Sequence, residues 1–270
     1  MSSIQGRALC VAGAGHVAFA VTMIGLGIMA LVRGEFPPIW SGAPKGLPGR
    51  EALVYLCALV SLFSGAGLFW QRTAAASSGV LLACFMVWLL AFRVPLILTA
   101  PTSSGMWWAC GETALMVAAS WTLYAGLAAA AGRERRRFAA GDTSVRIARA
   151  LYGLALIPFG VAHFTFLERT VSMVPSWLPW HLGWAYFTGS AFIAAGLAVV
   201  AGVWPRLAAR LSALQLLLFT LLVWVPILAA GADAADWFEA IDSWALTAGA
   251  WVVADSYRGM PWLAAYRYRA

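Results

Sequence analysis

The amino-acid sequence predicts an all-α integral membrane protein, with eight transmembrane helices arranged as two parallel-repeat four-helix bundles. The first observation behind this fold class is composition, since 62% of the 270 residues are hydrophobic and only 11% are charged. The second is that the apolar residues form runs close to the roughly 20 residues that a helix needs to cross a bilayer. The third is an internal repeat, because segments of the first half recur in the second half. These observations exclude a soluble domain.

Eight apolar runs define the predicted helices. They cover residues 8–32, 52–70, 79–100, 113–131, 147–167, 184–203, 211–230 and 243–255. The first run is much longer than the roughly 7–15 apolar residues of a secretory signal peptide, so we expect it to remain as a helix. The last run is the shortest, and it crosses a membrane only if Ile241, Asp242 and flanking residues extend it.

Lysine and arginine positions predict the orientation, because cytoplasmic loops carry more of these residues than outer loops do. With the N-terminus inside, four basic residues fall on the outer side, namely Arg33, Lys45, Arg50 and Arg169. Thirteen fall on the cytoplasmic side, namely Arg7, Arg72, Arg133, Arg135, Arg136, Arg137, Arg146, Arg149, Arg206, Arg210, Arg258, Arg267 and Arg269. We therefore expect a multi-pass protein of a bacterial-type inner (cytoplasmic) membrane with cytoplasmic N- and C-termini.

The net charge of +7 follows from this topology and requires no nucleic-acid partner. The expected partner is the lipid bilayer itself. The basic run "GRERRRF" at residues 132–138 is explained by topology, with contact to anionic lipid headgroups or to a partner protein as the alternative.

The internal repeat is defined by matched segments around prolines and acidic residues. The segment "FRVPLIL" matches "VWVPILA", which aligns Pro95 with Pro226. The segment "WWACGETALMVAASW" matches "WFEAIDSWALTAGAW", which pairs Glu112 with Asp242. Since each half holds an even number of predicted helices, both halves enter the membrane from the same side and the repeats are parallel.

The repeat also predicts the domain organisation. A shorter match joins "GAGH", which ends at His16, to "GVAH", which ends at His163. The expected units are a first four-helix repeat (residues 1–132), a basic cytoplasmic linker (133–144), a second four-helix repeat (145–258) and a cytoplasmic tail (259–270).

The second half carries a longer pattern. His163 and Phe164 are followed by "MVPSWLPWHLGWAYFTG" (173–189), "AAGLAVV" (194–200) and "RLAARL" (206–211). This pattern resembles the DoxX-like integral membrane proteins, four-helix modules in which a first-helix histidine precedes a Val-Pro outer loop and a glycine-rich second helix. The resemblance covers nearly all of the second half and extends more weakly over the first, so the chain resembles a tandem duplication of the module.

The resemblance implies partners. Some DoxX-like proteins accompany thiosulfate–quinone or other membrane redox systems, which implies membrane or peripheral subunits of a redox complex. Members often carry a glutamate within the second helix, whereas the matching positions here are Phe63 and Phe192. If that acid serves quinone or proton chemistry in the relatives, this chain has lost it.

The candidate site is predicted from polar residues in or beside the apolar runs, because each such group is costly in a membrane unless it has a partner. Arg93 lies in the outer part of the third run, and Glu112 begins the fourth helix at the same membrane face. We expect a buried ion pair between them, which either staples the bundle or holds an anionic or quinone-like headgroup. His163 lies near the same face, and the loop carrying Trp177 and Trp180 would cover the site as an apolar lid.

His16 is the remaining candidate ligand. If His16 and His163 face each other, they would hold a haem as its axial ligands. The alternative is that each imidazole bonds a helix carbonyl or a buried acid. No other metal site and no catalytic residue is predicted. The favoured expectation is that no cofactor is bound, with a quinone or a haem as the alternatives.

The four cysteines all lie in the first half, as Cys10, Cys57, Cys84 and Cys110, and none forms a CxxC motif. A disulfide between Cys57 and Cys110 is one alternative in an oxidising periplasm. The other is that these thiols are buried as small hydrophobic side chains.

Two functions remain after these observations. The favoured one is a non-catalytic subunit or scaffold of a redox-associated membrane complex, because intramembrane acids and histidines are few. The alternative is a membrane electron-transfer protein that binds a lipophile, either a quinone or a haem.

Overall fold

The computed structural model describes residues 13–130 and 142–265. In these two ranges helices joined by connecting segments make up the chain, and an isolated β-bridge pairs Val203 with Ala265. Seven helical segments of the described ranges are long and apolar enough to cross a membrane. The prediction of an all-α membrane protein is therefore confirmed.

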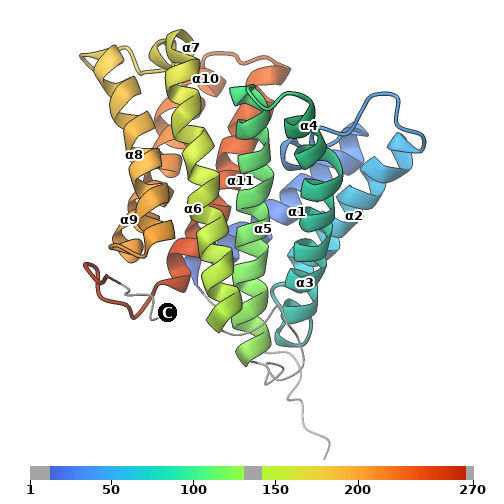
Figure 1. The fold of residues 1–270 in the computed structure, drawn as a ribbon. Coiled ribbons are helices and arrows are strands. Elements are labelled where there is room, and N and C mark those ends of the chain that lie inside the picture. The colour runs from blue at the N-terminus through green and yellow to red at the C-terminus, as the bar shows by residue number, and fades with distance from the viewer. Residues whose placement is uncertain (1–12, 131–141, 266–270) are drawn as a thin grey trace, which may run out of the picture.

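The seven segments run in alternate directions along the bundle (Figure 1). They are α1 (Ala14–Arg33), α2 (Arg50–Gly67), the joined α3 and α4 (Gln71–Thr99), α5 (Ser104–Ala130), α6 (Asp142–Thr165), α8 (His181–Ala201) and the joined α9 and α10 (Pro205–Ala229). We call the end of the bundle that holds the start of α5 the upper end, and the end that holds the start of α6 the lower end. The short helix α7 (Leu167–Ser172) lies at the upper end.

Helix α11 (Ala234–Ser256) has 23 residues but is not among these seven segments. Four acidic residues make it less apolar: Asp236, Glu239, Asp242 and Asp255. The helix begins with a capping box, in which Asp233 accepts a hydrogen bond from the N–H of Asp236 and Asp236 accepts one from the N–H of Asp233. Helix α11 thus includes Ile241 and Asp242 in addition to the shortest apolar run.

Two prolines explain why two of the segments change helix type. Helix α3 (Gln71–Trp88) continues through a π-helical turn, η2 (Leu89–Arg93), into α4 (Val94–Thr99), which carries Pro95. Helix α9 (Pro205–Phe219) likewise continues through η4 (Thr220–Trp224) into α10 (Val225–Ala229), which carries Pro226. Proline has no N–H and crowds the carbonyl one turn earlier, and a π-helical turn lets the helix continue past it.

Helices α5 and α11 form the centre of the bundle. Helix α5 packs against α3, α6 and α11, while α11 packs against α1, α5 and α9. The two central helices approach closely at Gly249, where a Cβ would lie 2.6 Å from Leu115 Cδ2. Since other helices cover much of both, they carry polar residues at a lower cost than a lipid-facing helix would.

Glycines set the crossing of α6 and α8. A Cβ on Gly153 would lie 2.8 Å from the carbonyl oxygen of Gly196, and one on Gly160 would lie 2.5 Å from that of Gly189. Small residues let two membrane helices pack backbone to backbone. The resulting van der Waals contacts hold the helices together, because lipid provides no hydrophobic driving force for their association.

Two sequence predictions need correction. The linker was predicted at residues 133–144, but α6 already begins at Asp142, an acid that favours the first turn of a helix. His16 lies in the first turn of α1 and His163 in the last turn of α6, so the "GAGH"–"GVAH" match does not join equivalent positions. Several predictions concern residues outside the described ranges, namely the run 132–138, Arg7, Cys10, Arg267 and Arg269.

Candidate functional site

Two carboxyl groups meet between the central helices, near the upper end. Glu112 of α5 and Asp242 of α11 are within hydrogen-bonding distance of each other. Asp242 is 8% exposed, and its buried Oδ1 has no amide, hydroxyl or guanidinium donor among the described residues. The sequence matched these two acids as counterparts but did not predict that they touch.

Trp108 connects this pair to a predicted ligand residue. Its indole Nε1 donates a hydrogen bond to Glu112 Oε1, one helical turn away on α5. Its ring also stacks on His163, with the ring centroids 6.2 Å apart and the planes inclined by 17°. The spacing of four between Trp108 and Glu112, which places both on one helix face, is the sequence signal for this contact.

His163 is enclosed by aromatic rings. Its Nδ1 lies 2.7 Å from the carbonyl oxygen of Phe159, one turn earlier on α6. The centroids of Phe192 and Phe219 lie 5.5 and 5.6 Å from that of the imidazole. His163 is thus a packing residue whose Nδ1 bonds its own helix, which agrees with the carbonyl alternative.

Arg93 is buried but does not pair with Glu112 as expected. Its Nε donates to Thr113 Oγ1 at 3.1 Å, and its Nη2 donates to Ser41 Oγ at 2.9 Å. In the described part of the chain the ion pairs involve Arg169, Arg210 and Arg258 instead. The guanidinium of Arg93 thus donates hydrogen bonds to two hydroxyl oxygens, and it attracts the carboxyl groups of Glu112 and Asp242 electrostatically over a longer distance.

Two upper-end loops combine prolines with tryptophans, and we call them the first (residues 34–49) and the second (173–180) Pro–Trp loop. The first Pro–Trp loop folds into the bundle and helps to hold Arg93. Its short helix η1 (Pro38–Trp40) is buried. Trp40 stacks on Phe85 at 4.3 Å between centroids and donates its Nε1–H to Ser61 Oγ at 2.9 Å. This packing fixes the next residue, Ser41, which accepts the hydrogen bond from Arg93.

The second Pro–Trp loop does not act as the expected lid. Trp177 is 68% exposed and Trp180 is 85% exposed. Their loop joins α7 to α8 at one edge of the upper end (Figure 1). The structure therefore brings Glu112 and His163 into contact with Trp108, and Arg93 interacts electrostatically with Glu112. Trp177 and Trp180 take no part in these contacts.

His16 lies at the opposite end of the bundle. Its Nε2 is 3.2 Å from the carbonyl oxygen of Leu68, and the neighbouring Gly15 N–H donates to Asp255 at 3.0 Å. Asp255 and Asp242 are separated by about 20 Å along α11, at about 1.5 Å per residue. Since His163 lies near the Asp242 level, the two histidines do not fit the axial positions of one haem.

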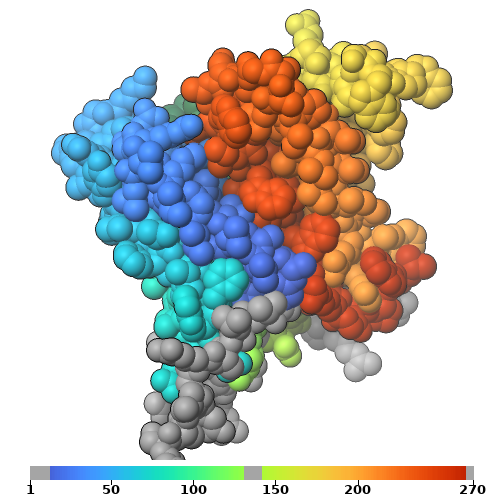
Figure 2. Space-filling model, turned by 180° about the vertical axis from the view of Figure 1, so that it is seen from behind, coloured from blue at the N-terminus to red at the C-terminus, as the bar shows by residue number. Residues whose placement is uncertain are grey.

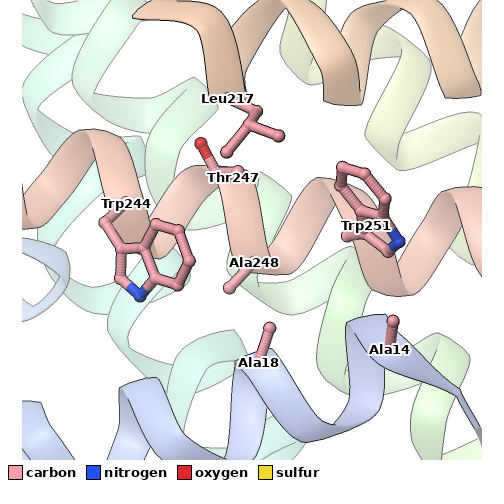
Figure 3. Close-up of a pocket in the computed structure, with 7 residues that line it drawn as sticks. All are labelled: Ala14, Ala18, Leu217, Trp244, Thr247, Ala248 and Trp251. Carbon is pink, nitrogen blue, oxygen red and sulfur yellow. The ribbon is translucent and has the colours of Figure 1, made fainter. Parts of the chain in front are cut away.

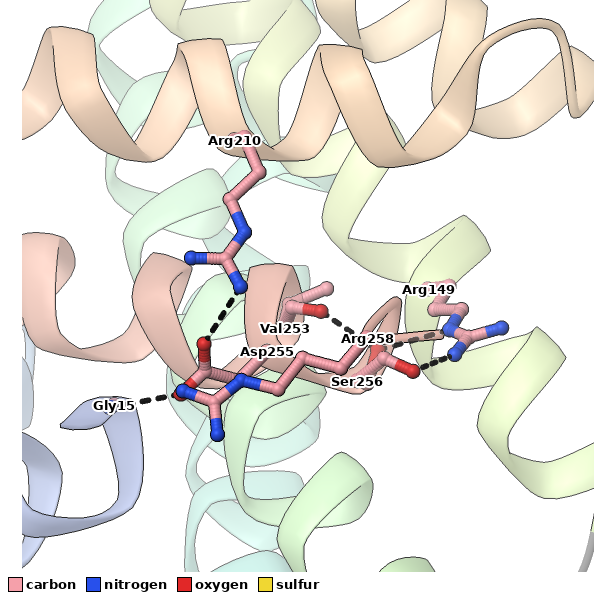
Figure 4. Close-up of polar contacts among 7 residues, drawn as sticks. All are labelled: Gly15, Arg149, Arg210, Val253, Asp255, Ser256 and Arg258. Atoms are coloured by element: carbon pink, nitrogen blue, oxygen red, sulfur yellow. Dashed lines mark hydrogen bonds and ion pairs between the residues drawn. The ribbon is translucent and has the colours of Figure 1, made fainter. Parts of the chain in front are cut away.

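A polar network ties α1, α6 and α9 to α11 at the lower end (Figure 4). Asp255 of α11 accepts hydrogen bonds from Arg210 of α9 at 3.0 Å, from Gly15 of α1 at 3.0 Å and from Arg258 at 2.9 Å. Arg149 of α6 bonds the hydroxyl and the carbonyl oxygen of Ser256. The arginines sit at the C-terminal end of α11, where positive charge complements the helix dipole.

An apolar groove runs along α11 on the rear face, bordered by α1, α9, η4 and α10 (Figure 2). It contains two adjoining cavities of about 170 and 260 Å³ that share Trp244. The lining of the first cavity is drawn in Figure 3 and includes Ala14, Ala18, Leu217, Trp244, Thr247 and Ala248. Asp242 precedes Trp244 by two residues, about 200° around the helix, so the groove and the carboxyl pair lie on opposite faces of α11.

Cysteines and metal-ligating residues form no further site in the described ranges. Cys57, Cys84 and Cys110 are free thiols, so a Cys57–Cys110 disulfide is not formed. The physical reason is their separate surroundings, because Cys57 lies on α2, which packs against α1 and α3, while Cys110 lies on α5, which packs against α3, α6 and α11. No group of three or more histidine, cysteine or acidic residues among the described residues could hold a metal ion.

Comparisons of the chain with protein-family models, with curated proteins and with solved structures find no match. The fold itself defines the class of protein, which is a multi-pass helical membrane protein with a polar centre.

Proposed function

We propose that this protein is a non-catalytic subunit or scaffold of a redox-associated complex in a bacterial-type inner membrane. In this proposal it is a tandem DoxX-like protein with eight crossings and cytoplasmic termini. The observation that carries the proposal is that three polar side chains of the centre form hydrogen bonds within the protein. Arg93 bonds two hydroxyls, His163 bonds a carbonyl, and Glu112 bonds Trp108 and Asp242.

Matching local geometry supports the two-repeat arrangement. Gly27 of α1 approaches the backbone of Ala58 on α2, just as Gly160 of α6 approaches that of Gly189 on α8. The close contact of Gly65 with Ala20 on the same first pair has its counterpart in the contact of Gly196 with Gly153. A π-helical turn also precedes Val-Pro in both halves.

The length of α11 supports an eighth crossing. Its 23 residues extend about 35 Å, more than the roughly 30 Å of bilayer hydrocarbon. Its acids need not face lipid, because Asp242 faces α5 and Asp255 is bonded to Arg210. An even number of crossings with the basic residues at the lower end favours cytoplasmic termini.

Photocrosslinking at a lipid-facing position tests the subunit proposal. Phe187 and Phe192 lie on the same helix, α8, but Phe187 is 63% exposed and Phe192 is 2% exposed. A photoreactive amino acid at position 187 in native membranes should give a discrete protein adduct that contains a redox subunit. The same group at position 192 is the control and should give none. Adducts with lipid alone at position 187, and at further exposed positions such as Leu197, would reject the proposal.

The apolar groove favours a second candidate, a protein that binds a quinone-like lipophile. Its walls of tryptophan, alanine and branched aliphatic residues suit a flat ring or an isoprenoid chain better than a polar substrate. Trp244 lines both cavities, whereas Trp237 on the same helix is similarly exposed and lines neither. If the groove binds quinone, Trp244→Ala should lower the quinone that co-purifies, and Trp237→Ala should not. Equal amounts in both variants, or none with the unsubstituted protein, would reject this candidate.

A further inference from the structure

The Glu112–Asp242 pair has a chemistry that a scaffold does not use. We infer that these two carboxyl groups form a proton-binding site inside the bundle, which holds one proton between them and exchanges it with water at the upper end. The inference goes beyond the proposed subunit function and does not depend on it. It rests on the contact between the acids, on an unsatisfied buried oxygen and on the charges around them.

Contact between two carboxyl groups requires a proton. Two carboxylates offer only acceptors and repel each other, so a hydrogen bond between them needs one protonated partner. With one proton the pair carries a single negative charge, which the nearby guanidinium of Arg93 balances. Loss of the proton would leave two negative charges against one positive charge, and unbalanced charge in a protein interior is costly.

Hydrogen-bond donors indicate which acid holds the proton. Glu112 receives the indole N–H of Trp108, so its charged form is stabilised. Asp242 is more than nine-tenths buried, and its Oδ1 receives no such donor from the described residues. A bare carboxylate oxygen in that position is expensive, whereas the carbonyl oxygen of a protonated acid is less so. The proton therefore resides on Asp242 and is donated to Glu112.

Glu239 connects the pair to water. It precedes Asp242 by about one turn on α11, towards the upper end. Its side chain is 46% exposed and lies 3.7 Å from Arg169 in a surface ion pair. It also interacts electrostatically with both Glu112 and Asp242. A carboxylate that touches water and lies one turn from the site can pass a proton in and take it back out.

The charged and titratable neighbours of the pair come from four elements. The π-helical turn η2 contributes Arg93 and α11 contributes Glu239, while α5 contributes Cys110, which interacts with Arg93. Helix α6 contributes His163, which touches Trp108 and uses Nδ1 on its own helix. In this set Arg93 is the cation whose positive charge balances the negative charge of the pair.

Infrared spectroscopy of the full chain in lipid nanodiscs tests the site through the carbonyl band of a protonated carboxylic acid. The unsubstituted protein should show this band at neutral pH, should shift it in deuterium oxide, and should lose it at alkaline pH. Glu112→Gln and Asp242→Asn should each abolish the band, because an amide N–H then replaces the shared proton. Both variants keep a hydrogen bond across α5 and α11, and thermal unfolding checks that they fold.

Two further variants make the test specific. Asp255→Asn removes an acid paired with arginines at the other end of α11, and should leave the band unchanged. Glu239→Gln should keep the band but slow its deuterium exchange several-fold. Absence of the band from the unsubstituted protein at neutral pH, or its persistence in both Glu112→Gln and Asp242→Asn, would overturn the site. An unchanged exchange rate in Glu239→Gln would show that the proton does not reach water through Glu239.

Discussion

The carboxyl groups of Glu112 and Asp242 meet at the interface between the two halves of the chain. Under the proposed repeat these two residues are counterparts. Counterparts related by a twofold axis touch only where they lie beside the axis, so the axis would pass between α5 and α11. This position explains why the polar centre lies on these two helices, which the other helices shield from lipid.

Gly42 should hold Arg93 in position. It has φ +98°, and a Cβ there would lie 2.7 Å from Arg93 Nη1. We expect Gly42→Ala to displace the guanidinium from Ser41 and to strain the turn, lowering the free energy of unfolding by about 1–3 kcal/mol. Thermal unfolding in detergent measures this. Gly46→Ala in the same loop is the control, since its Cβ would meet no atom within 4 Å, and equal losses would contradict the prediction.

The crossing of α6 and α8 should be intolerant of a methyl group at Gly160. Its Cβ would lie 2.5 Å from the carbonyl oxygen of Gly189, so Gly160→Ala must push the helices apart. The expected loss is about 1–3 kcal/mol of unfolding free energy. Gly126 on α5 has open space at its Cβ, and Gly126→Ala should be neutral or stabilise the protein by up to about 1 kcal/mol. Chemical unfolding of both variants decides whether packing or helix propensity governs the effect.

Position along the runs was enough to place Arg93, Glu112 and His163 at one end of the bundle. The sequence could not predict their hydrogen-bond partners, because these come from other elements. Arg93 uses the hydroxyl of Ser41, which reaches it only when the first outer loop folds inward. Glu112 uses Asp242, from a helix far away in the chain.

The two Pro–Trp loops show the same limit. Both loops contain prolines and tryptophans. Inside the bundle, however, Trp40 stacks on the ring of Phe85 and donates a hydrogen bond to the hydroxyl of Ser61. Trp177 and Trp180 stay exposed. Composition therefore predicts an interfacial loop in both cases, and the available interior contacts decide which loop is buried.

Asp255 should stabilise the lower end. It accepts hydrogen bonds from Arg210 and Arg258 and from the N–H of Gly15, so Asp255→Asn removes charge from all three contacts. Hydrogen bonds to charged groups contribute about 1.5–3 kcal/mol, and we expect a loss of that size in thermal unfolding. Arg169→Gln is the comparison, because its 3.7 Å pair with Glu239 is exposed and should contribute less than about 1 kcal/mol. A larger loss from Arg169→Gln than from Asp255→Asn would contradict this ranking.

Cysteine labelling in intact cells should establish whether α11 crosses the membrane. Ala235 is exposed at the start of α11, and Leu263, which is 65% exposed, follows its end. Thr143 is exposed at the start of α6, at the lower end. With the native cysteines replaced by alanine, Ala235→Cys should react with an impermeant maleimide in intact cells. Leu263→Cys and Thr143→Cys should react only after the membrane is opened, because the basic lower end is expected inside. If α11 does not cross, positions 235 and 263 will label from the same side. If the orientation is reversed, Thr143→Cys will label in intact cells while Ala235→Cys stays protected, so the two errors give different patterns.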